Sequence, residues 1–61
     1  MTSKLYAVYE RVFVDHELLE VSQEMWTEDE IFNRIKHMID VGYLVELRSP
    51  TSDTREIDFY L

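Results

Sequence analysis

The segment Thr27-Glu28-Asp29-Glu30 constrains the fold of this chain more than any other feature, because it specifies where a helix begins. It has the form of a capping box, in which the Thr27 hydroxyl accepts from the Glu30 amide and the Glu30 carboxylate accepts from the Thr27 amide. Acids in the first turn also complement the helix dipole. Apolar residues then recur at helical spacing, namely Ile31, Ile35, Met38 and Ile39, with Phe32 alongside. We therefore predict a helix over residues 28–41, ended by Gly42 in a left-handed conformation.

After Gly42 the apolar period changes from 3.6 residues to 2, which is typical of strands. Two alternating runs follow, and their apolar members are Tyr43, Val45 and Leu47 in the first and Ile57, Phe59 and Leu61 in the second. Residues 49–53 lie between the runs and contain Ser, Pro, Thr and Asp, which favour turns. We predict a β-hairpin whose apolar face packs on the helix.

The N-terminal part of the chain, residues 4–25, fits two structures. Its apolar residues Leu5, Val8, Tyr9, Val12 and Phe13 have helical spacing, yet valine and tyrosine favour strands. A hairpin here would turn at Asp15-His16, which lacks the Asn-Gly or Asp-Gly of tight hairpins. The first 32 residues contain no Gly, Pro or Asn. We favour helices, and the hairpin remains the alternative.

With helices in this part, the chain from about Glu17 to Leu61 resembles a winged helix-turn-helix domain. The matching features are a short helix at Glu17–Met25, a tight turn at Trp26-Thr27, the helix over 28–41, Gly42-Tyr43-Leu44, and a two-stranded wing ending in Phe59-Tyr60-Leu61. The expected fold is therefore α+β, a single winged-helix-like domain over residues 1–61 with helices followed by a C-terminal β-hairpin. The alternative is ββαββ, a four-stranded antiparallel sheet with one helix at 28–41.

The resemblance implies a dimeric DNA-binding transcriptional regulator. In that family the second helix enters the major groove and the wing touches the backbone. The residues placed near DNA would be Asn33, Arg34, Lys36, His37, Arg48 and Arg55. Affinity for DNA depends mainly on neutralising phosphates, and Glu28 and Asp29 at the start of the helix would be repelled. DNA binding is therefore the alternative function.

Negative charge is concentrated in the N-terminal half, which supports a different function. Residues 1–30 contain eight acids and two bases, whereas residues 31–61 contain five acids and four bases. Setting aside Glu28, Asp29 and Glu30, which have a local role at the helix start, the remaining acids are Glu10, Asp15, Glu17, Glu20 and Glu24. On a helix, Glu17, Glu20 and Glu24 would lie about 5–6 Å apart on one face; on a strand, Glu20 and Glu24 would still share a face.

We predict that these five acids bind and regulate or inhibit a protein partner. A row of carboxylates imitates a phosphate backbone, so a nucleic-acid-binding protein is the fitting partner class. The ordinary interpretation is a solvated face that keeps a small protein soluble. A chain of 61 residues without cysteine buries only about 60% of its unfolded surface. Because such a small core gives little stability, we also predict a homodimer or a complex with the partner.

Catalysis finds no support in the sequence. The serines form no motif with His16 or His37, cysteine is absent, and a single glycine excludes a glycine-rich phosphate loop. We therefore predict a non-enzymatic protein without metal or cofactor. No apolar run reaches the roughly 20 residues that span a membrane. The residues Met1-Thr2-Ser3-Lys4 lack the features of a signal peptide, so the predicted location is the cytoplasm, that of a host cell if the chain is virus-encoded.

Overall fold

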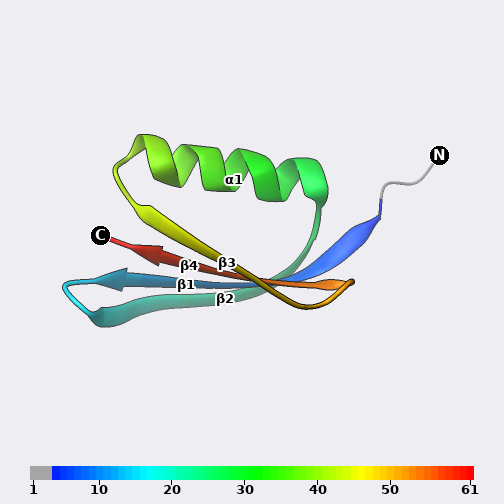
Figure 1. The fold of residues 1–61 in the computed structure, drawn as a ribbon, viewed down its shortest axis with the longest axis horizontal. Coiled ribbons are helices and arrows are strands. Elements are labelled where there is room, and N and C mark those ends of the chain that lie inside the picture. Colours follow the sequence, from blue (N-terminus) through cyan, green and yellow to red (C-terminus); the bar gives the residue numbers. More distant parts are fainter. Residues whose placement is uncertain (1–3) are drawn as a thin grey trace.

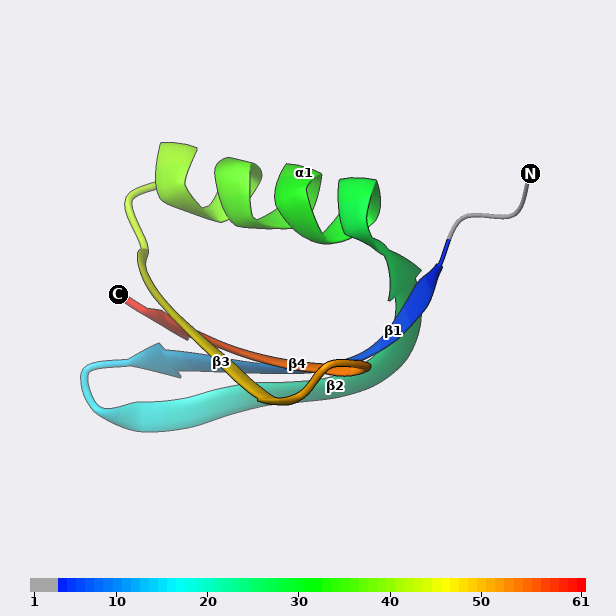
Figure 2. The same ribbon diagram turned by 45° about the vertical axis from the view of Figure 1, so that its right-hand side comes forward.

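The computed structural model describes residues 4–61 as one mixed sheet with a helix on one of its faces (Figures 1 and 2). The elements in chain order are β1 (Leu5–Val14), β2 (Glu17–Thr27), α1 (Glu28–Asp40), β3 (Leu44–Thr51) and β4 (Thr54–Tyr60). The strand order is β2-β1-β4-β3. The pairs β1–β2 and β3–β4 are antiparallel, and β1–β4 is parallel. Strands β2 and β3 are therefore the two edges of the sheet.

The winged-helix prediction is wrong. Residues 17–25 belong to strand β2 and not to a helix, so α1 follows a strand and there is no helix-turn-helix within residues 4–61. The ββαββ alternative has the observed order of elements, but its all-antiparallel sheet is also wrong. Helix α1 connects β2 to β3, which run in the same direction at opposite edges. This crossover leaves the centre of the sheet to β1 and β4, which consequently lie parallel.

The first two strands form a hairpin, and buried side chains recur at every second residue of β1. One polar residue among them makes this period of 2 hard to recognise in the sequence. The side chains of β1 that face α1 are Tyr6, Val8, Glu10 and Val12, and all four are buried. Glu10 interrupts the apolar alternation that is typical of a strand. The apolar residues of this segment therefore fit helical spacing as well as strand spacing. At the turn, Asp15 and His16 have φ angles of 51° and 67°. Both are left-handed, as in the turns that tight hairpins usually make with Asn-Gly.

The core is small and lies between α1 and the two central strands. Its buried apolar side chains are Tyr6, Val8, Val12, Ile31, Ile57 and Phe59, and five more are partly buried against them: Trp26, Ile35, Met38, Tyr43 and Val45. Ile57 and Phe59 of β4 are completely inaccessible to solvent. Within residues 4–61 no element covers the opposite face of the sheet, which we call the open face (Figure 2).

The predicted helix and C-terminal hairpin are confirmed, but the helix ends one residue early, and β3 extends to Thr51, within residues 49–53 that were predicted as the turn. The capping box is present, with Glu30 N donating to Thr27 Oγ1 at 3.4 Å and Thr27 N donating to Glu30 Oε1 at 3.3 Å. At the other end Gly42 has a φ of 106°. Its N–H donates to the Ile39 carbonyl and the Tyr43 N–H donates to the Met38 carbonyl, each at 3.0 Å. These two bonds are those of a Schellman motif.

Gly42→Ala should lower the free energy of unfolding by about 1 kcal/mol, because an L side chain is strained at positive φ. A Cβ at this position meets no atom within 4 Å, so the loss comes from the backbone alone. Urea denaturation of the two chains measures it. Gly42→Asn is the control and should lose less, since asparagine tolerates the left-handed region. Equal stability of the alanine variant and the wild type would contradict the prediction.

Candidate partner-binding surfaces

Three of the predicted acids, Glu17, Glu20 and Glu24, form a row along edge strand β2, which we call the acid row. Residues paired across antiparallel strands share a face. The register pairs Glu17 with Val14, Glu20 with Val12 and Glu24 with Val8. Because Val8 and Val12 are buried beneath α1, the acid row lies on the helix-facing side of β2. All three carboxylates are exposed.

The spacing of the acid row differs from the prediction. On a strand, a rise of about 3.3 Å per residue separates Glu20 and Glu24 by about 13 Å, rather than by the 5–6 Å expected on a helix. Their shared face, which was also expected for a strand, is confirmed by the register. The row is therefore an extended line of separate carboxylates, and it resembles a phosphate backbone in charge but not in spacing.

Helix α1 supplies a cation at one end of the acid row. The Arg34 guanidinium lies 5.9 Å from the centre of the Trp26 ring. The Trp26 Nε1–H in turn donates to Glu24 at 2.5 Å. This contact orients the Glu24 carboxylate, while no hydrogen bond or ion pair with another described residue holds the Glu17 and Glu20 carboxylates in one position.

Glu10, the fourth predicted acid, is not a surface residue and does not join the acid row. It is 3% exposed and lies in the core layer beneath α1. Arg34 Nε approaches Glu10 Oε2 at 3.3 Å, and Glu10 Oε1 has no hydrogen-bond partner among the described residues. Burial raises the pKa of the Glu10 carboxyl; Arg34 opposes this shift, and the charges of Glu24 and Glu20 add to it.

Glu10→Gln should stabilise the chain at pH 7. Because the pKa of Glu10 is raised in the folded state, the folded chain holds this proton to a higher pH than the unfolded chain does. The free energy of unfolding therefore falls as pH rises through the carboxyl range. Glutamine cannot ionise, so the variant avoids this loss. We expect a gain of about 1 kcal/mol, because a neutral amide costs less to bury than a carboxylate that a single arginine contacts.

The gain should disappear well below pH 4.5, the ordinary pKa of the group, where Glu10 is neutral in both states. Urea denaturation at the two pH values measures it. Glu17→Gln, at an exposed position and not among the charges that act on Glu10, is the control and should change the free energy of unfolding little at either pH. A variant less stable than the wild type at pH 7 would contradict the expected sign.

The fifth predicted acid, Asp15, lies in the β1–β2 turn, directly before the Glu17 end of the acid row. Its side chain is exposed, and its N–H lies 3.4 Å from the Leu61 carbonyl. Asp15 therefore extends the negative surface around the turn without joining the acid row on β2.

The residues predicted for DNA binding do not form a common basic surface. The exposed side chains Asn33, Arg34, Lys36 and His37 lie on α1, and Arg48 and Arg55 lie on β3 and β4. Arg34 reaches Glu10, and Arg48 Nη2 donates to Asp58 at 2.6 Å. The Arg55 guanidinium lies 4.4 Å from the centre of the Tyr6 ring. All three arginines of this set are thus engaged within the chain, and the recognition-helix geometry that motivated the assignment is absent from residues 4–61.

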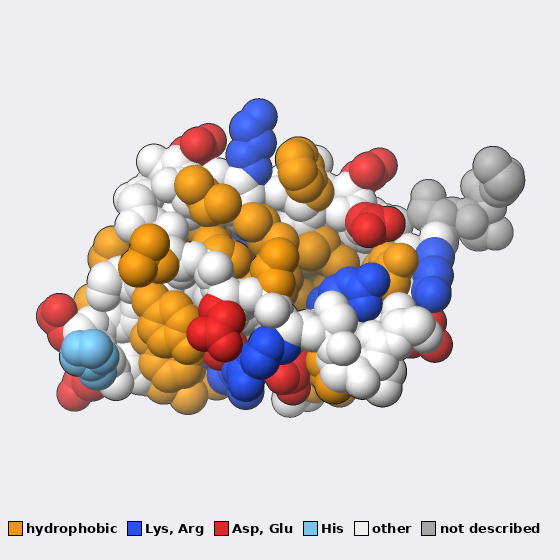
Figure 3. Space-filling view, in the orientation of Figure 1, with side chains coloured by type: hydrophobic (Ala, Val, Ile, Leu, Met, Phe, Trp, Pro, Cys, Tyr) orange, Lys and Arg blue, Asp and Glu red, His pale blue; other side chains and the backbone are white. Residues whose placement is uncertain are grey.

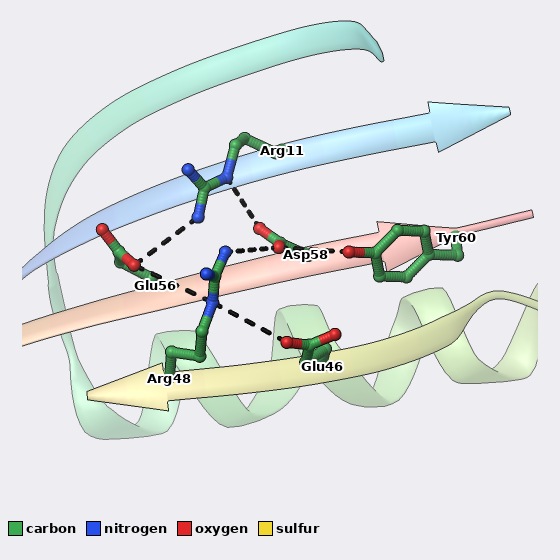
Figure 4. A network of polar contacts seen from close by, with 6 residues as sticks. All are labelled: Arg11, Glu46, Arg48, Glu56, Asp58 and Tyr60. Atoms are coloured by element: carbon green, nitrogen blue, oxygen red, sulfur yellow. Dashed lines mark hydrogen bonds and ion pairs between the residues drawn. The ribbon is translucent and has the colours of Figure 1, made fainter. Parts of the chain in front are cut away.

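The open face carries a polar network that the sequence does not predict (Figure 4). At its centre is Asp58 of β4, which is 3% exposed. It accepts from Arg11 Nε at 2.7 Å, Arg48 Nη2 at 2.6 Å and the Tyr60 hydroxyl at 3.3 Å. Glu56 and Glu46 complete the network at longer distances. The parallel register that pairs Arg11 with Asp58 is a contact between distant segments, so no local sequence pattern reveals it.

An apolar band crosses the open face beside this network. The rings of Phe13 and Tyr60 stack with their centres 4.9 Å apart. The register continues the band to Leu18 on β2 and Leu44 on β3, which are 49% and 75% exposed. Burial raises the pKa of the Tyr60 hydroxyl, and the charge of Asp58 adds to the shift.

An apolar groove lies between α1 and β3, with a volume of about 210 Å³. Its apolar lining is Ile31, Phe32, Ile35, Leu47 and Ile57. Figure 3 shows hydrophobic side chains gathered below the helix on this side of the molecule. Phe32 and Leu47 are 65% and 61% exposed, so α1 covers this edge of the sheet only in part.

Comparisons with models of known protein families, with curated proteins and with solved structures find no match. The described part of the chain contains no helix that is long and apolar enough to cross a membrane. Among residues 4–61, no three His, Asp or Glu side chains group in a way that could hold a metal ion. The function of the chain is therefore inferred from its acid row, its open face and its apolar groove.

Proposed function

We propose that this chain is a small acidic, non-enzymatic protein that binds a nucleic-acid-binding protein through the acid row and thereby inhibits or regulates it. The observation that carries the proposal is the acid row itself, three exposed carboxylates on one side of an edge strand. The sequence of β2 contains no Lys or Arg. This surface consequently attracts basic side chains and repels nucleic acid.

The chemistry of phosphate recognition supports this partner class. Arginine and lysine side chains that grip phosphates also pair with carboxylates, and arginine does so with the same two-pronged geometry. The acid row spans about 23 Å from Glu17 to Glu24 at the rise of a strand. A partner with basic side chains distributed along a groove of similar length can engage all three carboxylates. Such a partner places the activity in the cytoplasm.

The edge position of β2 adds a second means of binding. An edge strand presents backbone N–H and C=O groups that have no partner strand, and an extended segment of another protein can pair with them. Backbone pairing supplies affinity, and the acid row selects a basic partner and speeds its association. Added salt should therefore weaken binding, but part of the affinity should remain at high salt because backbone hydrogen bonds do not depend on the charges.

The proposal is tested by capture from a cell extract on three immobilised chains. The first is the wild type, the second carries Glu17→Gln, Glu20→Gln and Glu24→Gln, and the third carries Glu28→Gln, Asp29→Asn and Asp40→Asn. Each triple variant has a formal charge of −4 against −7 for the wild type. A difference between the two variants therefore reports the position of the acids and not the total charge.

We expect the wild type and the third chain to retain a basic nucleic-acid-binding protein, and the acid-row variant to lose it. Duplex DNA added to the extract should compete for the retained protein. Equal retention by the two triple variants would refute a role for the acid row. Retention of duplex DNA by the purified chain at low salt, lost on Arg34→Ala and Arg55→Ala, would instead show direct DNA binding.

A further inference from the structure

The two edges of the sheet differ in charge. β2 carries the three carboxylates of the acid row and no base, whereas β3 carries one acid, Glu46, and one base, Arg48. The register pairs Glu46 with Asp58 and Arg48 with Glu56, so both side chains lie on the open face. Their side chains are 56% and 47% exposed. β3 is therefore a nearly neutral edge with one charge of each sign, and both side chains are partly exposed although Arg48 also donates to Asp58 of its own subunit.

The helix-facing side of β3 is apolar and only partly covered. Leu47 is opposite Ile57, which is completely buried, yet Leu47 itself is 61% exposed because it lies beyond the reach of α1. Phe32 and Ile39 on α1 are 65% and 54% exposed. Phe32 and Leu47 both line the groove between α1 and β3. Residues 44–48 pair regularly with β4, whereas Pro50 and a shift of register follow Arg48. Because a proline and a bulge hinder strand pairing, the part of this edge that is suited to pairing with another strand is residues 44–48.

We infer that β3 pairs with β3 of a second copy of this chain, antiparallel about a two-fold axis that passes beside Leu47. In this register Leu47 lies opposite Leu47 of the second copy, and Val45 lies opposite Ser49. On the open face, Glu46 lies opposite Arg48 of the second copy, and the two-fold axis repeats the pair. Each subunit thus contributes the same surface, as a closed two-fold interface requires.

Charge selects this register among its neighbours. Centring the axis on Glu46 or on Arg48 places like charges directly opposite, which destabilises a strand pair. Centring it on Val45 places Glu46 opposite Leu44 and leaves its charge without a partner across the interface. Pairing β2 with β2 of a second copy brings together two acid rows, which repel. The β3 pair centred on Leu47 is the arrangement that joins opposite charges.

The dimer forms an eight-stranded sheet with both helices on the same face, since an axis perpendicular to the sheet preserves the two faces. The grooves of the two subunits meet over the Leu47 pair and exclude water there. Burial of this apolar surface supplements a core of only six buried apolar side chains. The two acid rows remain at the outer edges, separated by seven strand spacings, or about 34 Å in a flat sheet.

A charge-pairing experiment at Leu47 tests the inference, because this side chain is exposed and makes no ionic contact within the subunit. Sedimentation equilibrium should show a dimer for the wild type. The Leu47→Glu and the Leu47→Lys chains should each be monomeric, with dissociation constants at least about 100-fold weaker, because like charges face each other across the axis. An equimolar mixture of the two variants should form a heterodimer through opposite charges.

Far-UV circular dichroism verifies that each variant is folded, and Leu19→Glu is the matched control. Leu19 is 64% exposed on the other edge strand, so this variant should dimerise like the wild type. A wild type that is monomeric at millimolar concentration would overturn the inference. Dimers of undiminished affinity in both Leu47 variants would also overturn it. These results are independent of partner capture through the acid row, which is on the opposite edge.

Discussion

Replacing Phe59 with alanine is expected to unfold most of the protein at room temperature. Phe59 is completely buried in the central strand β4. Its ring meets that of Tyr43 edge to face, with the ring centres 6.4 Å apart. A buried Phe→Ala substitution costs about 3–5 kcal/mol, and a core of this size supplies a total stability of about the same amount. The loss therefore consumes nearly the whole stability of the chain.

Circular dichroism with urea denaturation measures this effect. Leu19→Ala removes a similar apolar side chain from an exposed position and should change the free energy of unfolding by no more than about 0.5 kcal/mol. A Phe59→Ala chain that remained folded, with a midpoint close to that of the Leu19→Ala chain, would show that Phe59 does not anchor the core.

Removal of the Asp58 carboxylate is expected to have the second largest effect. Asp58→Ala deprives Arg11 and Arg48 of the acceptor that both contact at 2.7 Å or less. Breaking a fully buried ion pair costs about 3–5 kcal/mol. The side chains of Arg11 and Arg48 are 30% and 47% exposed, so water replaces part of the lost contact. We expect a loss of about 2–3 kcal/mol.

A double-mutant cycle separates this interaction from other effects of the substitution. Arg11→Met alone leaves the buried Asp58 with fewer cations, and the chain that carries both Arg11→Met and Asp58→Ala lacks both partners. The sum of the stability losses of the two single variants should therefore exceed the stability loss of the double variant by at least about 1 kcal/mol. Strictly additive losses would show that Arg11 and Asp58 do not stabilise one another.

The sequence predicts the C-terminal part of the fold because its signals are local. The capping box, the Gly42 terminus and the change of period each act within a few residues, and the structure contains α1 and the β3–β4 hairpin where these signals place them. The prediction for the N-terminal part is wrong because of two features of β1 and the turn that follows it. Glu10 occupies a core position on β1, and the Asp15-His16 turn adopts left-handed angles without glycine or asparagine.

The parallel pairing of β1 with β4 could not be predicted from either strand. It joins segments almost fifty residues apart, as Arg11 and Asp58 illustrate, and it depends on the path of the helix that connects the two hairpins. The same limit applies to the candidate surfaces. The clustering of Glu20 and Glu24 on one face follows from strand geometry, whereas the burial of Glu10 depends on where α1 packs.

Among the described residues, ten other exposed large apolar side chains accompany Leu47, against six that are buried in the core. Phe32 and Leu47 line the groove, and Leu18 and Leu44 belong to the apolar band of the open face. We propose that the β2 edge attracts a basic partner and that the β3 edge pairs with itself, which would explain why these strands carry such different charge. The acid row then prevents the sheet from extending at β2 into an open-ended assembly.

The separate roles of the two edges are tested most directly by crosslinking. A photo-reactive amino acid is introduced at each edge in turn, and the products crosslinked in a cell extract are identified by mass spectrometry. From position Leu19, between Glu17 and Glu20, the account predicts an adduct with a basic nucleic-acid-binding protein. From position Ser49 on β3 it predicts an adduct of twice the mass of the chain. A chain–chain adduct from Leu19, or the same foreign protein captured from both positions, would contradict the assignment of separate roles to the two edges.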